Sequence, residues 1–141
     1  MPSLFDRPPV RFQYPDNWTL DVESGDQRPQ TVTVSGPDGP FWSVSVHPAD
    51  ADLQSLAKEA TEAMSEEYEE VESAAATETI GDFEAIGYDL NFYYLDLTNT
   101  AVVRCFRSPQ GVYAVFYQAE DRDFERLSEV FQAITASLLM A

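Results

Sequence analysis

Cysteine and histidine each occur once in this chain of 141 residues, as Cys105 and His47. A single cysteine excludes a disulfide within the chain and fits a reducing compartment, so we expect a cytoplasmic protein. A zinc site would need several carboxylates to supplement this one histidine and one cysteine. A catalytic Cys105–His47 pair would need the two side chains in contact, and nothing in the sequence brings them together. We therefore predict no metal, no cofactor and no enzymatic activity.

Long apolar runs are also missing. No stretch approaches the roughly 20 apolar residues that a membrane-spanning helix requires. The opening sequence, MPSLFDRPPVRF, has no apolar core typical of a signal peptide and no cysteine that could carry a lipid. The sequence therefore predicts neither a membrane span nor an export signal.

Basic side chains are few: eight Lys and Arg stand against 25 Asp and Glu, which gives a net charge of −17. Nucleic acids and anionic membranes both attract clustered basic residues, so neither is an expected partner. The acidic surface either attracts cations or a basic protein, or only keeps the chain soluble. The glutamate-rich stretch 66–72 lacks the glycine of a calcium-binding loop, so a solvated helix end is the simpler interpretation.

The stretch 83–118 contains three β-type runs in succession. From Ile86 to Tyr94, apolar and aromatic residues occupy every second position, which is typical of a strand with one buried face. Two further runs follow at 101–107 and 112–118, and both carry apolar residues at odd and even positions. Short connections join antiparallel neighbours, so we predict a meander whose second and third strands lie inside a sheet.

The remaining pattern predicts an α+β domain with an antiparallel sheet of about six or seven strands flanked by two long helices. Residues 1–10 are expected to form a loose arm, and residues 11–141 a single domain. Apolar residues spaced by three and four predict the two helices, from about 53 to 68 and from about 123 to 140. Further strands are expected at 11–14, 18–22, 31–35, 41–47 and 71–80, the third and fourth of these as a hairpin.

Three short segments resemble the Mog1/PsbP family. These are Phe12 to Trp18 with its aromatic–Pro–x–x–Trp pattern, Ile80 to Tyr88 with its glycines, and the closing helix from Phe124 to Ser137. The resemblance implies an antiparallel sheet sandwiched by helices, and a binding or scaffolding role without catalysis. Mog1 binds a small GTPase and PsbP supports photosystem II, but no binding motif of the family can be carried over to residues of this chain.

Alternation also predicts a polar sheet face. If Trp42, Val44 and Val46 face the core, the residues between them face away. We expect this face to bind a protein partner, with tyrosine and arginine as anchors; a merely solvated face is the alternative. The candidate residues are Ser43, Ser45, His47, Asp89, Asn91, Tyr93, Arg104 and Tyr113.

Taken together, the sequence predicts a non-enzymatic binding or scaffolding domain that acts through protein–protein contacts. The partner is expected to be a protein with basic character, and a homodimer stays open as an alternative. A second hypothesis is a domain that binds a small ligand or a cation through its acidic surface and a pocket between sheet and helix.

Overall fold

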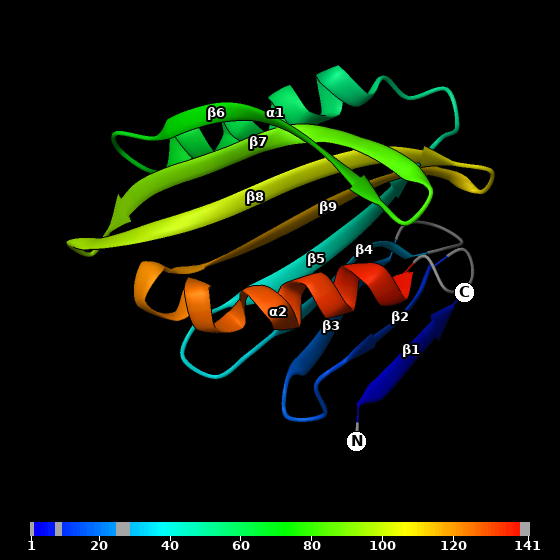
Figure 1. Ribbon diagram of the computed structural model, residues 1–141, viewed down its shortest axis with the longest axis horizontal. Coiled ribbons are helices and arrows are strands. Elements are labelled where there is room, and N and C mark those ends of the chain that lie inside the picture. Colours follow the sequence, from blue (N-terminus) through cyan, green and yellow to red (C-terminus); the bar gives the residue numbers. More distant parts are fainter. Residues whose placement is uncertain (1, 8–9, 25–28, 139–141) are drawn as a thin grey trace.

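The computed structural model describes residues 2–7, 10–24 and 29–138. It shows an α+β fold with a seven-stranded antiparallel sheet in the order β3-β4-β5-β9-β8-β7-β6, a separate β1–β2 hairpin and two helices (Figure 1). The elements are β1 (Ser3–Arg7), β2 (Val10–Tyr14), β3 (Thr19–Ser24), β4 (Pro29–Ser35), β5 (Phe41–His47), α1 (Leu53–Glu67), β6 (Glu72–Ile80), β7 (Phe83–Tyr94), β8 (Leu97–Ser108), β9 (Gly111–Glu120) and α2 (Asp121–Leu138).

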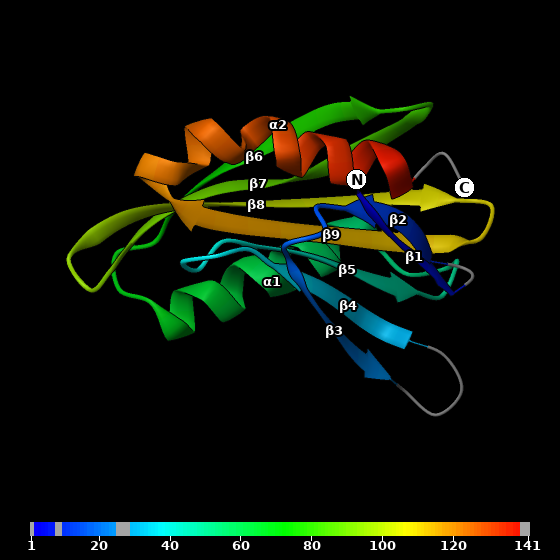
Figure 2. The ribbon, with the colours of Figure 1, turned by 90° about the horizontal axis from the view of Figure 1, so that it is seen from below.

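The helices cover opposite faces of the sheet. Helix α2 packs on β8 and β9 and also contacts β2, while α1 packs on β7, β8 and β9. In Figure 2 the sheet separates the two helices, and the β1–β2 hairpin lies beside the C-terminal end of α2. Neither of these helices is apolar enough along its length to cross a membrane, within the described part of the chain.

The predicted meander is confirmed as β7, β8 and β9. Strands β8 and β9 lie inside the sheet, and most of their side chains are buried on both faces, as the two-sided apolar pattern predicts. The connection between β7 and β8 is shorter than the gap at 95–100 between the predicted runs. Leu95 and Asp96 adopt positive φ angles of 53° and 63° and form the turn, so β8 already begins at Leu97.

Close approach of β7 and β8 explains one glycine of the meander. A Cβ added at Gly87 would lie 1.7 Å from the carbonyl oxygen of Val103, which is backbone and cannot move aside cheaply. Gly87 therefore permits the register in which it faces Arg104.

The core on the α2 side is large and aromatic. Phe131 is fully buried, and its ring lies 4.7 Å from that of Tyr117 and 6.0 Å from that of Trp18, centroid to centroid. The indole of the fully buried Trp42 donates a hydrogen bond to the Thr135 hydroxyl at 2.9 Å, so the helix satisfies this buried donor. The apolar stripe of α2 thus packs in the same core as the inward face of β5.

The core on the α1 side is smaller. Its buried helix residues are Ala57 and Met64, which pack against Leu90, Phe92 and their neighbours on β7 and β8. Helix α1 ends at Glu67, as its late glutamates predict, because negative charge disfavours the helix C-terminus. This helix therefore covers only one half of its sheet face.

Two predictions about the N-terminal part need correction. Residues 1–10 are not simply a loose arm, because Ser3–Arg7 forms β1 and pairs with β2. The expected strand at 11–14 belongs to this hairpin rather than to the main sheet. Burial of Phe5 against Phe12, with ring centroids 5.4 Å apart, supplies the apolar contact that fixes the hairpin. The predicted strands at 31–35, 41–47 and 71–80 are confirmed within β4, β5 and β6.

Candidate functional site

The eight candidate residues do not lie on one face, so that part of the prediction is wrong. Residues directly opposite each other in antiparallel strands share a face. Trp42 on β5 lies opposite Tyr117 on β9, and the row continues through Val102 on β8 to Asp89 on β7. Asp89 therefore faces α2 together with Trp42, whereas Ser43 faces the α1 side. Each face of the sheet is covered by one helix. A strand in one half of the sheet can therefore bury its apolar side chains under α1, while a strand in the other half buries them on the α2 side.

Ser43, Ser45 and His47 lie on the α1 side of β5, in the half of the sheet that α1 leaves uncovered. The Ser45 hydroxyl and His47 Nε2 are 2.9 Å apart. Burial lowers the pKa of His47, and the negative charge of Glu59 on α1 acts in the opposite direction. The imidazole is therefore mainly neutral at physiological pH, and it can accept the proton of the Ser45 hydroxyl in a hydrogen bond.

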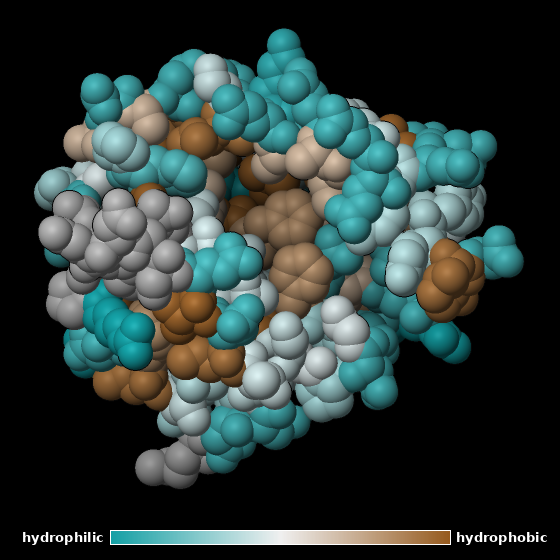
Figure 3. All heavy atoms as spheres, turned by 180° about the vertical axis from the view of Figure 1, so that it is seen from behind, coloured by the Kyte–Doolittle hydropathy of each residue, from teal (hydrophilic) through white to brown (hydrophobic). Residues whose placement is uncertain are grey.

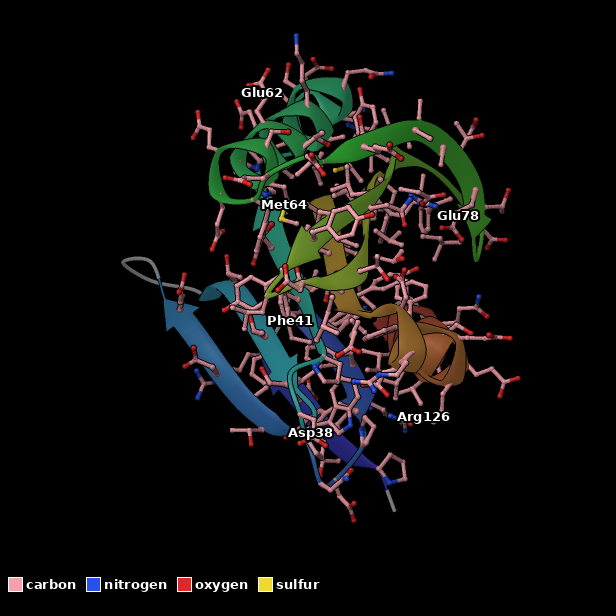
Figure 4. All side chains as sticks on the ribbon, turned by 90° about the vertical axis from the view of Figure 1, so that its left-hand side faces the viewer. Asp38, Phe41, Glu62, Met64, Glu78 and Arg126 are labelled. Carbon is pink, nitrogen blue, oxygen red and sulfur yellow. The ribbon has the colours of Figure 1, made fainter. Side chains whose placement is uncertain are left out.

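The face of the molecule opposite to that of Figure 1 has a hollow with hydrophobic side chains on its floor (Figure 3). Phe41 of β5 stacks on Phe116 of β9 with ring centroids 5.7 Å apart, and both are partly exposed. Figure 4 shows Phe41 and Met64 on this side of the sheet and Glu78 on the opposite side, toward α2.

Arg104 and Tyr113 are buried, at 7% and 2% exposure, so neither is available as a surface anchor. The Arg104 guanidinium pairs with Glu78 at 2.5 Å and with Asp89 at 2.7 Å. It also donates hydrogen bonds to the backbone carbonyls of Tyr88 and Val103. Arg104 thus joins β6, β7 and β8 on the α2 side, which is a structural role. The sequence could not show this role, because Glu78 and Asp89 come next to Arg104 only through the register in which β6, β7 and β8 pair.

Asn91 and Tyr93 lie near the β7–β8 turn, beside a pocket of about 410 Å³. Carboxylates of Glu70, Glu72 and Asp121 line it. The Thr100 hydroxyl donates a hydrogen bond to Asp121 at 2.6 Å and lies 3.1 Å from the side-chain amide of Asn91. Three separate segments therefore bring negative charge to one end of the sheet.

Beyond this pocket, the β7–β8 turn carries a group of exposed apolar side chains that the sequence reasoning missed. Tyr93 and Tyr94 are 53% and 54% exposed, Leu95 is 76% exposed and Leu97 is 42% exposed. We call these four residues the hairpin tip. The turn projects from the end of the sheet in both ribbon views (Figures 1 and 2). Its signal in the sequence is a leucine at each side of Asp96 in a turn, where polar residues are usual.

Cys105 lies on the α1 face but cannot act with His47. Cys105 pairs with Ala114, which pairs with Ser45, so two strand spacings, roughly 10 Å, separate β8 from β5. Burial raises the pKa of the Cys105 thiol to about 11, so it is protonated and unreactive. Within the described residues, no three His, Cys, Asp or Glu side chains come together as a metal site.

Comparisons with known proteins bear on the fold. No protein-family model matches the chain, and no curated protein matches it in sequence. The solution structure of the PsbP of the cyanobacterium Synechocystis sp. PCC 6803 (CyanoP) is similar over 96% of this chain and 90% of its own, with a TM-score of 0.64 at 11% identity. The chain has a Mog1/PsbP-like fold.

Two further solved structures share this Mog1/PsbP-like fold. PA94 of Pseudomonas aeruginosa, described as a protein of unknown function and putative regulator, has a TM-score of 0.54 at 12% identity, over 97% of this chain and 95% of its own. A Bacteroides thetaiotaomicron protein has a TM-score of 0.59 at 15% identity over 91% of this chain, and the match spans only 43% of that longer protein. At these identities the likeness establishes the fold alone.

Proposed function

We propose that this chain is a non-enzymatic, cytoplasmic binding domain that acts through protein–protein contacts, and that the hairpin tip is its principal contact surface. The observation that carries the proposal is the concentration of exposed apolar side chains at one place. Six large hydrophobic side chains are exposed among the described residues, and four of them form the hairpin tip. Such a cluster on a projecting turn is typical of an interaction site.

The partner is expected to be basic around an apolar recess. Tyrosines are enriched at interface centres because they bury a large area and offer a hydroxyl at the edge. The carboxylates of Glu70, Glu72 and Asp121 lie beside Tyr93, and Asp96 lies within the turn itself. Lys and Arg at the rim of the partner would complement them. A second copy of this chain would bring the same negative charge, which disfavours a homodimer through this surface.

The test is a tagged pull-down from the native organism's lysate with the wild-type chain and with Tyr93→Glu and Leu95→Glu. The matched control is Leu20→Glu on β3, which adds the same charge at an exposed leucine outside the tip. We expect a partner that is retained by the control, lost with both tip variants, and released as salt rises from about 0.05 M to about 0.5 M. A partner that both tip variants retain would overturn the role of the hairpin tip.

A pocket between sheet and helix supports the small-ligand hypothesis as a second candidate. A recess of about 440 Å³ lies between β2 and α2, lined by Gln13, Tyr14, Val130, Ala133 and Ile134 among others. This volume suits a small, mostly apolar molecule. A thermal-shift screen tests it: a saturable rise in melting temperature that Ala133→Trp abolishes would favour ligand binding. A screen without any such compound would count against it.

A further inference from the structure

Strand β6 is an open edge of the main sheet. Among the described strands it pairs only with β7, through nine residue pairs from Glu72–Asn91 to Ile80–Phe83 without a shift in register. Its outward N–H and C=O groups form a row about 30 Å long, at the usual rise per residue. Such a row is a template for another strand. In Figure 1 no described strand lies beyond β6 at this margin of the sheet.

Strand β6 contains no lysine, no proline and no bulge, and its charged residues, Glu72 and Glu78, lie only near its two ends. Natural edges carry lysine, proline or a bulge that prevents a further strand from pairing. The middle of β6 reads Ser-Ala-Ala-Ala-Thr at 73–77, whose small side chains present no steric barrier. The opposite edge, β3, differs: it is shorter, its register shifts between Glu23 and Ser24, and it has no run of alanines. The two edges of one sheet are therefore unequal in their capacity to accept a strand.

A recess flanks β6 on each face. On the α1 side, Gln54, Ala75, Thr77, Ile86 and Tyr88 are among the residues that line a pocket of about 190 Å³. The opposite recess, on the α2 side, has a volume of about 230 Å³. Its lining includes Glu78, Ile80, Arg104, Tyr117 and Gln132. Successive side chains of a strand point to opposite faces, so a strand added beside β6 would direct alternate side chains toward the two recesses.

Charge decides which strand fits. Glu72 and Glu78 point to the α2 side near the two ends of β6, and each of them has an exposed side chain. Glu78 pairs with Arg104, but Asp89 neutralises the same guanidinium, so the group as a whole is negative. The recess on the α1 side is lined by Ile86 and Tyr88 and suits an apolar side chain. A second copy of the chain would bring another net charge of −17 and the same glutamates.

We propose that β6 binds an extended segment of another protein by strand addition, and that this segment carries Lys or Arg toward the α2 side and apolar residues toward the α1 side. Main-chain hydrogen bonds to β6 supply the affinity and the two recesses supply the sequence preference. This contact is separate from the hairpin tip and does not depend on it.

The probe is a displayed library of random nine-residue peptides, selected against the immobilised full chain. The best peptide is then synthesised with a fluorophore, and its Kd is measured by anisotropy. We expect selected peptides to be enriched in Lys and Arg at alternate positions. Amide exchange measured by NMR should show new protection at outward-facing amides of β6 when the peptide is bound.

Proline variants test the geometry. In an antiparallel edge strand, neighbouring residues point their N–H groups in opposite directions, so one of Ala75→Pro and Ala76→Pro removes an outward N–H while the other disrupts pairing with β7. The variant that keeps the wild-type circular dichroism spectrum should weaken the peptide's Kd about tenfold, because an interstrand hydrogen bond is lost and the proline ring obstructs the added strand. Leu20→Glu, on the opposite edge strand β3, should leave the Kd unchanged.

Three results would overturn the proposal. The first is a selection that yields no binding peptide, and the second is a peptide whose Kd stays the same in the folded proline variant. The third is amide protection that develops elsewhere than on β6, and this readout decides the case on the wild-type chain even if both proline variants unfold. The Kd of the peptide reports on the β6 edge and the pull-down with the tip variants reports on the hairpin tip, so failure of one proposal can be told from failure of the other.

Discussion

The two sides of the central sheet differ in how completely they are closed. On the α2 side, the helix and the β1–β2 hairpin together bury aromatic rings from five strands and from the helix itself. On the α1 side, the helix packs on β7, β8 and β9 through two alanines, one methionine and two partly buried leucines, and the same face of β5 has partly exposed serines. One side therefore contributes most of the apolar burial, and the other retains accessible surface.

This difference suggests that one side of the sheet mainly stabilises the fold and that other surfaces are available for binding. Free energy of folding scales with apolar area removed from water, so the aromatic side should dominate the resistance to unfolding. Surface that is not needed for the core is free to serve contacts, and the hairpin tip and the β6 edge both lie at the margins of the sheet rather than over the α2 core. The comparison between the two sides can be tested by mutation.

The largest expected effect is at Phe131. Phe131→Ala removes a fully buried ring that contacts Trp18, Tyr117 and Phe124, and it should lower the free energy of unfolding by about 3–5 kcal/mol. Met64→Ala, on the α1 side, should cost about 2 kcal/mol, since its site near the helix end can collapse more readily. Urea unfolding followed by tryptophan fluorescence gives both values. Equal losses would contradict the unequal division of the core.

Arg104→Lys, on the α2 side near the β6 edge, should lower the free energy of unfolding by less than Phe131→Ala does. A lysine cannot reproduce the fork that reaches Glu78, Asp89 and two backbone carbonyls at once, so we expect a loss of about 1–2 kcal/mol. Both carboxylates are partly exposed and can be rehydrated, which keeps the loss below that of a fully buried pair. The matched control is Arg122→Lys, whose exposed pair with Glu120 should contribute almost nothing. Equal losses in both variants would contradict the structural role of Arg104.

The fold was predictable from local patterns because burial repeats with the period of each element. Alternation identified β7, the two-sided apolar runs identified β8 and β9, and the spacing of three and four identified α2. Strand β1 was not recognised because Pro2, Pro8 and Pro9 obscured the short pattern between them. Its pairing depends on tertiary contact with Phe12, which no local signal reports.

The candidate site was less predictable, because it depends on which face of the sheet the alternating side chains of each strand occupy. Alternation shows that Trp42 and Ser43 face opposite directions, but it does not relate Ser43 on β5 to Asp89 on β7, three strand pairings away. The same limit explains why Tyr113 was taken as a surface residue when its ring packs edge-on against Phe106. Only Tyr93 of the two predicted tyrosine anchors is exposed, and its neighbours in the hairpin tip were assigned to a turn or to the core.

The smallest expected effect concerns His47 on the open side of the sheet. Burial lowers the pKa of His47 in the folded chain below its ordinary value of 6.5, so the unfolded chain takes up this proton first as pH falls. The stabilising contribution is present above that value and is lost as pH falls through the folded-state pKa. The free energy of unfolding of the wild-type chain should therefore fall relative to that of His47→Gln between about pH 7 and about pH 5. The many carboxylates titrate alike in both chains and cancel in this difference. A relative gain in wild-type stability over the same range would contradict this prediction, because it would mean that the attraction of Glu59 for the charged imidazole outweighs burial.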